Sequence, residues 1–399
     1  MRTLTFLLLL LLTACVHDPK EVLQQKLNHA ETITELSLSI DLTENDGILT
    51  SFLQRPMKEL PAEIGRFTNL EKLWLIGNHL DSLPKEFGNL RDLRELTLTF
   101  NRFTQVPSVI FSLSNLELLR MSGNRISNYP SEISRLTKLK TLFLGSNDLI
   151  KIPSAIGDLG VLESLNLSDN HLIELPPEIG MLSNLRTLFL DENQLTSLPK
   201  EIGNLTNLRL FHLSKNQLTS LPPQIGNLEN LTSLQVHGNN LKTLPKEIEK
   251  LVLLDDLLID SNQLQDLPVE FSNLTSLRLL NLKNNSFSNI PLAVFKMYNL
   301  QYLFLADNQI KEVPPQISQL QNLEYLDLGG TDIMQLPPEI ARCSKLRFLA
   351  LSRTAITQLP TELNGLESFD TVLFLESKLT SEQKVAMKKN FRKIEFIFE

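Results

Sequence analysis

Few side chains in this sequence have both the chemistry and the spacing that catalysis or metal binding requires. The chain has two cysteines and six histidines. It contains no phosphate-binding glycine loop, no H-E-x-x-H motif and no C-x-x-C motif. His212 and His237 fall near each other in the repeat described below, but no third metal ligand shares their register. We therefore expect no enzyme activity, no metal site and no cofactor.

Cys15 is the side chain best placed for covalent modification. It follows a basic start, an apolar run over residues 4–12 and two small residues. The run is too short to cross a bilayer, so we predict a signal peptide over residues 1–14. Leu12-Thr13-Ala14-Cys15 resembles the lipobox of bacterial lipoproteins. The resemblance implies lipid attachment at Cys15 and a place in the bacterial cell envelope, at the outer membrane or cell surface. The alternative is an ordinary secretory signal.

Asparagine recurs at a constant interval along most of the chain. An amide can donate and accept hydrogen bonds at once, so we predict that these side chains point inward and bond the backbone of their own turn and of the neighbouring repeat. The same step later reaches Thr331, Thr354 and Ser377, whose hydroxyls have fewer donors. The interval is 23 residues, and the asparagines are Asn78, Asn101, Asn124, Asn147, Asn170, Asn193, Asn216, Asn239, Asn262, Asn285 and Asn308.

The segments between the asparagines share one pattern, L-x-x-L-x-L-x-x-N-x-L-x-x-L-P-x-x-I-x-x-L, as over residues 185–205. L-x-L has the period of a strand with one buried face, and L-P-x-x-I-x-x-L suits a short 3₁₀ turn. This unit resembles the leucine-rich repeat family from residue 36 to 379. The resemblance implies an α/β solenoid, a horseshoe with a concave parallel β-sheet and convex short helical or 3₁₀ segments.

The repeat also delimits the segments of the chain. After the signal peptide, residues 15–32 are predicted to hold the lipidated N-terminus, a linker and a capping helix. The solenoid, of about 15 repeats, covers residues 33–379, and residues 380–399 form a closing helix and strand. Asp41 stands at an asparagine position, and the surplus at 42–59 after it is either a capping insertion or a degenerate repeat.

Two further features exclude classes of function. Cys343 stands where other repeats have leucine, so we predict a buried apolar substitute rather than the nucleophile of a ubiquitin-ligase-type effector. The net charge of −8 argues against nonspecific nucleic-acid binding. The lysine-rich run within residues 384–393 is then most simply the solvated face of the closing helix.

Residues that alternate with the leucines escape the packing demand and face the concavity. Tyr302, Tyr325 and Phe348 fall in one column of three consecutive strands. Such aromatic patches, and arginines, are typical of binding surfaces. The alternatives are cross-strand stabilisation by the aromatics and pairing of the arginines with Glu95 and Asp148. The predicted partner-binding residues are Tyr302, Phe304, Tyr325, Phe348, Leu279, Leu258, Trp74, Phe100, Arg102, Arg120 and Arg125.

The regular unit at residues 198–208, the lipobox and the helix-plus-strand end together resemble the leptospiral leucine-rich repeat proteins. That family implies exported or surface proteins that engage host or envelope proteins. We expect a monomeric, non-enzymatic, membrane-anchored module that binds a protein on its concave face and binds no nucleic acid. The alternative is a structural envelope protein that acts through self-association.

Overall fold

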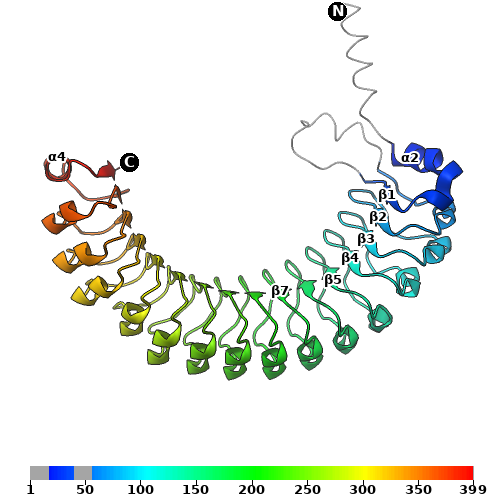
Figure 1. The fold of residues 1–399 in the computed structure, drawn as a ribbon, viewed down its shortest axis with the longest axis horizontal. Helices are drawn as coiled ribbons and strands as arrows, with labels where there is room; N and C mark the ends of the chain where they lie inside the picture. The colour runs from blue at the N-terminus through cyan, green and yellow to red at the C-terminus, as the bar shows by residue number, and fades with distance from the viewer. Residues whose placement is uncertain (1–17, 40–55, 399) are drawn as a thin grey trace, which may run out of the picture. The chain divides into compact units, whose positions relative to one another are not determined.

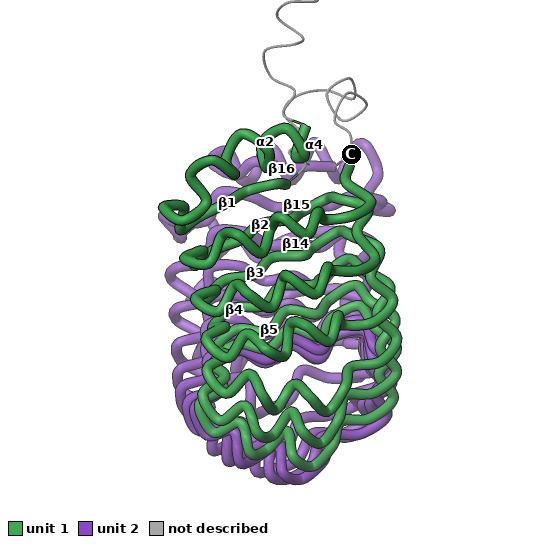
Figure 2. Tube along the Cα trace, turned by 90° about the vertical axis from the view of Figure 1, so that its right-hand side faces the viewer, with its two compact units in different colours: residues 1–185 green, residues 186–399 purple. Residues whose placement is uncertain are grey.

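The computed structural model describes residues 18–39 and 56–398. Contacts divide the chain into two compact units, Met1–Leu185 and Arg186–Glu399, which Figure 2 shows in different colours. The predicted signal peptide, Cys15, Asp41 and most of the predicted insertion at 42–59 lie outside the described residues. In the described part of the chain, no helix is both long enough and apolar enough to cross a membrane.

The first unit starts with a capping segment and continues with short strands and 3₁₀ segments (Figure 1). Helix α2 (Pro19–Lys26) and segment η1 (Leu27–Thr32) bury Leu23, Leu27 and Ala30 beside the first strand. The strands are β1 (Glu35–Ser37), β2 (Lys72–Trp74), β3 (Glu95–Thr97), β4 (Leu118–Arg120), β5 (Thr141–Phe143) and β6 (Ser164–Asn166). The 3₁₀ segments are η3 (Ala62–Arg66), η4 (Lys85–Asn89), η5 (Ser108–Ser112), η6 (Ser131–Arg135), η7 (Ser154–Asp158) and η8 (Pro177–Met181).

The second unit repeats the same alternation and ends in helix α4 (Ser381–Asn390) and a last strand. Thr380 and Gln383 form a capping box at the start of this helix. The strands are β7 (Thr187–Phe189), β8 (Leu210–His212), β9 (Ser233–Gln235), β10 (Asp256–Leu258), β11 (Leu279–Asn281), β12 (Tyr302–Phe304), β13 (Tyr325–Asp327), β14 (Phe348–Ala350), β15 (Thr371–Leu373) and β16 (Glu395–Ile397). The 3₁₀ segments are η9 (Lys200–Asn204), η10 (Pro223–Asn227), η11 (Lys246–Lys250), η12 (Val269–Asn273), η13 (Leu292–Lys296), η14 (Pro315–Gln319), η15 (Pro338–Arg342) and η16 (Thr361–Gly365).

The strand register follows the repeat. The described residues form sixteen strands, and within each unit the strands pair in parallel and in chain order. Leu73 lies opposite Leu96 in the first unit, and Leu303 lies opposite Leu326 in the second, so that one repeat separates the partners. These central leucines are fully buried and form the core. Within each unit the sheet lines the concave side and the 3₁₀ segments lie on the convex side (Figure 1), which confirms the predicted solenoid.

The asparagines that recur every 23 residues are buried and hydrogen-bonded to the backbone, as predicted. The Asn285 amide donates to the carbonyls of Ile259, Leu282 and Lys283, and its oxygen accepts from the Leu264 N–H. One side chain thereby joins its own turn to the preceding repeat.

The hydroxyl residues that end this series make fewer bonds. Within the described part of the chain, Thr331 donates to the Leu328 carbonyl alone, at 2.6 Å, and Thr354 donates to the Leu351 carbonyl alone, at 2.8 Å. The buried Ser377 hydroxyl has no partner among the described residues. The hydroxyls therefore tie the repeats together less completely than the amides do.

A second set of asparagines, which we did not predict, bonds neighbouring repeats near the 3₁₀ segments. These residues stand nine positions before the buried asparagines or their equivalents, and each donates its amide to a backbone carbonyl of the preceding repeat, at 2.7 to 2.9 Å. They are Asn69, Asn115, Asn184, Asn230, Asn299 and Asn322. Because only some repeats have asparagine there, the pattern is less regular in the sequence.

Candidate functional site

The side of the sheet that faces away from the 3₁₀ segments, here called the open face, is where side chains are free of the core. On β12, Leu303 is fully buried, whereas Tyr302 on its flank is 37% exposed. The open-face residues therefore need not be apolar for the fold to form. At the position of Tyr302, the strands β5, β6 and β7 carry Thr141, Ser164 and Thr187.

The aromatic row, defined as Tyr302, Tyr325 and Phe348, lies on the open face of the second unit. The three residues are register partners on β12, β13 and β14, as predicted. The Tyr325 and Phe348 rings stack with their centroids 4.6 Å apart and an interplanar angle of 4°. The Phe304 ring contacts Tyr325 at 5.0 Å. The rings of Phe304, Tyr325 and Phe348 form one contiguous aromatic surface. Tyr302 and its register partner Leu279 lie next to it on β12 and β11.

An acidic group lies beside this aromatic surface. Asp327 is half-buried on β13 and accepts a hydrogen bond from the Gly329 N–H at 2.9 Å. Burial raises the pKa of the Asp327 carboxyl. This effect is larger than the lowering of the same pKa by the Gly329 N–H and by the positive charge of Lys283. Burial, together with Asp327, also raises the pKa of the Tyr325 hydroxyl. The aromatic surface therefore has a carboxyl group beside it that can accept hydrogen bonds, and the Tyr325 hydroxyl can donate one.

The residue before each asparagine position has a left-handed backbone conformation, which we did not predict. Phe100 has φ 56°, Asp307 has φ 57° and Arg353 has φ 57°. This conformation is uncommon for residues with a side chain. Asp307 and Arg353 form an ion pair at 2.6 Å across the intervening repeat, where Gly330 stands. A Cβ on Gly330 would lie 2.3 Å from the Asp307 carboxylate, so a larger residue there would displace this carboxylate.

The arginines predicted to bind a partner lie on the first unit. Arg120 is half-buried on β4, and its guanidinium lies over the Phe143 ring at 5.4 Å. Arg102 and Arg125 are exposed, each directly after a buried asparagine. The alternative that we considered, pairing with Glu95 and Asp148, does not occur among the described residues. Glu95 instead lies 3.9 Å from Lys72, and Asp148 lies 3.8 Å from His171.

The remaining predicted residues occupy the same face without forming one cluster. Trp74 on β2 and Leu258 on β10 are half-buried. Phe100 is 55% exposed in the turn after β3. The structure therefore groups Tyr302, Phe304, Tyr325, Phe348 and Leu279 on adjacent strands of the second unit.

The described groups with catalytic potential do not form a reaction centre. His212 lies 3.7 Å from Asp191 and packs against Phe189, and burial lowers the pKa of its imidazole more than Asp191 raises it. No group of three His, Cys, Asp or Glu side chains within residues 18–39 and 56–398 could hold a metal ion. Cys343 is fully buried, and burial raises the pKa of its thiol to about 12, which keeps it protonated at neutral pH.

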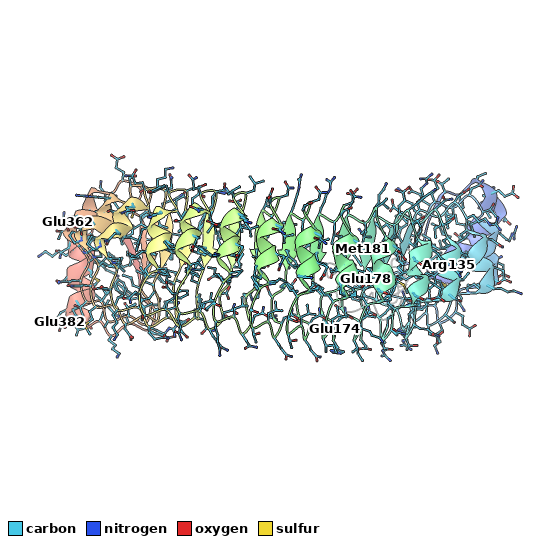
Figure 3. All side chains as sticks on the ribbon, turned by 90° about the horizontal axis from the view of Figure 1, so that it is seen from below. Arg135, Glu174, Glu178, Met181, Glu362 and Glu382 are labelled. Carbon is cyan, nitrogen blue, oxygen red and sulfur yellow. The ribbon has the colours of Figure 1, made fainter. Side chains whose placement is uncertain are left out.

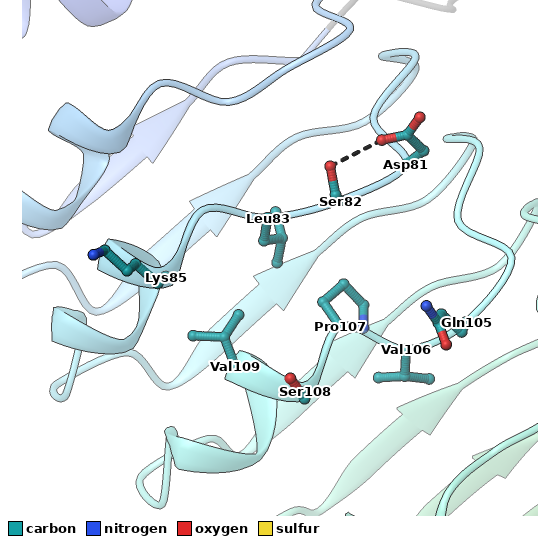
Figure 4. Close-up of a pocket in the computed structure, with 9 residues that line it drawn as sticks. All are labelled: Asp81, Ser82, Leu83, Lys85, Gln105, Val106, Pro107, Ser108 and Val109. Carbon is teal, nitrogen blue, oxygen red and sulfur yellow. Dashed lines mark hydrogen bonds between the residues drawn. The ribbon is translucent and has the colours of Figure 1, made fainter.

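A groove of about 410 Å³ lies between two consecutive repeats of the first unit (Figure 4). It is lined by residues 81–83, Lys85 and residues 105–109. Ser82 donates to the Asp81 carboxylate at 2.9 Å, and Lys85 lies on the 3₁₀ segment of the same repeat. No histidine or cysteine lines the groove. The Ser82 hydroxyl and the Asp81 carboxylate therefore have no histidine in the lining to act as a general base between them.

Comparison with protein families identifies the repeat. The family model described as a leucine-rich repeat region matches residues 49–145, 127–210, 199–293 and 292–394. Together these matches cover most of the chain. No curated protein matches it.

Solved structures of the same architecture come from several organisms. A leucine-rich repeat protein of Leptospira interrogans is 31% identical, with a TM-score of 0.76 over 92% of this chain and 90% of the other. A plant peptide hormone receptor in complex with RGF2 is 29% identical, with a TM-score of 0.66 over 92% of this chain and 67% of that chain. An internalin of Listeria monocytogenes shares the fold at 23% identity, with a TM-score of 0.66 over 89% of this chain and 92% of the other.

Proposed function

Because the chain belongs to the leucine-rich repeat family, a fold typical of protein-interaction modules, we propose that it is a non-enzymatic module that binds a protein partner on the open face of its sheet. We further propose that lipid on Cys15 anchors it in the bacterial cell envelope. The observation that carries the first proposal is the aromatic row. The second rests on the sequence pattern that ends at Cys15.

The aromatic row has properties that favour binding over a purely structural role. The fold does not require aromatic residues at this register, because other strands carry threonine or serine there. Tyrosine and phenylalanine bring large contact areas to an interface. The stack of Tyr325 on Phe348 holds the rings in place before a partner arrives, so that little side-chain entropy is lost on binding.

The environment of Cys343 supports the non-enzymatic part of the proposal. The Cys343 thiol donates to the Ile317 carbonyl at 3.2 Å and is shielded from solvent. A protonated and shielded thiol cannot attack a substrate. The L. interrogans leucine-rich repeat protein has the same fold. The plant peptide hormone receptor also has it, and its structure is a complex with RGF2.

Substitution of Tyr302, Tyr325 and Phe348 by serine together is expected to weaken binding of the partner about tenfold or more, because aromatic anchors dominate interface energies. The partner is first identified by a photo-crosslinking residue placed at position 325, and its affinity for the variant is then measured with purified proteins. Removal of the cross-strand ring packing should lower the free energy of unfolding by only about 1–2 kcal/mol.

The matched control is Tyr298→Ser, which removes a 57% exposed tyrosine from the connection after η13 in the same unit. It should leave the affinity unchanged. Unchanged affinity in the triple variant, with a large loss of stability, would show that the row only stabilises the sheet. Crosslinking of position 325 solely to another copy of the chain would favour the self-associating envelope protein instead.

Cys15→Ala is expected to abolish incorporation of labelled palmitate and to release the protein from the membrane fraction, because Cys15 is the proposed acyl acceptor. Lipid labelling and cell fractionation measure this directly. Cys343→Ala, which removes the other thiol, is the control and should keep the label. Membrane retention of the Cys15→Ala protein would refute lipid anchoring at this residue.

A further inference from the structure

The open face of the first unit carries cations that lack acidic partners. Elsewhere on this sheet, cations are paired: Lys72 lies 2.9 Å from Glu35, and Lys140 lies 2.7 Å from Glu117. By contrast, no described carboxylate forms an ion pair with Arg102, Arg120 or Arg125. In a chain with a net charge of −8, such a local excess of positive charge is an exception.

These arginines lie close together because of the repeat register. Arg102 and Arg125 both follow a buried asparagine, one repeat apart, so they are neighbours along the same edge of the sheet. Arg120 lies on β4 of the Arg125 repeat, and the Phe143 ring supports its guanidinium. Arginine offers several N–H donors in a fork that matches a carboxylate. The three guanidinium groups can therefore receive more than one carboxylate.

An exposed aromatic ring borders the arginines. Phe100 precedes the buried Asn101 and is 55% exposed in the left-handed conformation. Its ring covers Gly123 of the next repeat, where a Cβ would lie 2.3 Å from the Phe100 Cδ1 atom. Gly123 therefore leaves room for the Phe100 ring against the backbone of the repeat that carries Arg125. Trp74 and Ile76, both half-buried, continue the apolar area on the preceding repeat.

We propose that this surface, defined as Arg102, Arg120, Arg125 and Phe100, binds an acidic, extended segment of a protein partner. Carboxylates of the segment pair with Arg102 and Arg125, and an apolar side chain of the segment packs on Phe100. This inference rests on the proposed function and assigns the chemistry of a second binding surface. A polypeptide is favoured over a nucleic acid or another polyanion, because the surrounding protein is acidic and the aromatic ring needs an apolar side chain.

The imidazole of His79 provides an internal probe of this surface. Burial lowers the pKa of His79, and the positive charges of Arg102 and Lys58 lower it further. A carboxylate that pairs with Arg102 brings negative charge near the ring. The pKa of His79 should therefore rise when the acidic segment binds, which NMR titration can follow.

The experiment uses full-length protein and a fluorescein-labelled peptide of alternating glutamate and phenylalanine, with a glutamine–phenylalanine peptide for comparison. Fluorescence anisotropy should show binding of the glutamate peptide that weakens as salt rises. The double variant Arg102→Gln/Arg125→Gln should bind it about tenfold more weakly or worse. The matched control, Arg66→Gln/Arg135→Gln, makes the same charge change on the 3₁₀ segments of the same unit, where Figure 3 labels Arg135.

Three outcomes would overturn the inference. The first is equal affinity for the two peptides, and the second is an equal loss of affinity in both double variants. The third is tighter binding of heparin, single-stranded DNA or phosphatidylglycerol vesicles than of the glutamate peptide. If the glutamate peptide fails to bind but the triple serine variant of the aromatic row still loses its partner, the proposed function stands and only this inference fails. The failure of the inference and the failure of the proposed function can therefore be told apart.

Discussion

Replacement of Asn239 by alanine is expected to lower the free energy of unfolding by about 3–4 kcal/mol, because it leaves several buried backbone groups without partners. The amide of Asn239 is buried and joins two repeats. It donates to the carbonyls of Leu213, Val236 and His237, at 3.0, 3.0 and 3.3 Å, and its oxygen accepts from the Leu218 N–H at 3.0 Å. Alanine can form none of these bonds.

Urea denaturation measures the loss, and hydrogen exchange at the Leu218 N–H locates it. Asn240→Ala is the matched control, since Asn240 is exposed and its side chain accepts one long hydrogen bond among the described residues, from Gln263 at 3.4 Å. It should change stability by less than about 0.5 kcal/mol. The converse substitution, Thr331→Asn, should stabilise the second unit by about 1 kcal/mol, because an amide restores bonds that the threonine hydroxyl cannot make. Equal effects of Asn239→Ala and Asn240→Ala would refute the structural role of the buried asparagines.

Gly226→Ala is expected to destabilise the second unit by about 2–3 kcal/mol through a backbone clash between neighbouring 3₁₀ segments. A Cβ on Gly226 in η10 would lie 2.2 Å from the Glu247 carbonyl oxygen in η11. The obstacle is backbone, so no side-chain rotation can relieve it. Gly203 stands in the same relation to the Gln224 carbonyl, at 2.6 Å, so these two contacts leave no room for a Cβ.

The control for this prediction is Gly365→Ala on η16. A Cβ there meets nothing within 4 Å, so alanine should be neutral or stabilising by up to about 1 kcal/mol. Thermal and urea denaturation of the two variants provide the comparison. If the Gly226→Ala variant has the same melting temperature as the wild-type protein, the 3₁₀ segments separate more easily than their packing indicates.

Much of the architecture follows from the sequence because the same physical demands recur in each repeat. Leu303 and Leu326 must both be buried and their strands must pair in parallel, so the 23-residue interval is also the strand register. That register correctly predicts the column of Tyr302, Tyr325 and Phe348. Burial of Cys343 follows from the same argument, because it replaces a core leucine.

The local backbone between repeats could not be predicted in the same way. The left-handed turn that carries Phe100 and Arg353 is not marked by glycine in most repeats, because the turn's bonds to the next repeat hold it. The second set of asparagines, such as Asn230, also escaped prediction. Its members bond backbone carbonyls rather than fill a core position, so hydrophobic periodicity does not reveal them.

By itself, the sequence determined the repeat, the register and the residues that face the core, because leucine burial and backbone pairing impose one period on the chain. Only the tertiary structure decided which open-face side chains meet. It stacks Tyr325 on Phe348, pairs Asp307 with Arg353 across Gly330, and leaves Arg102 without an acid among the described residues. Such contacts depend on side-chain rotamers and on turns that lie between repeats, and the period does not encode either.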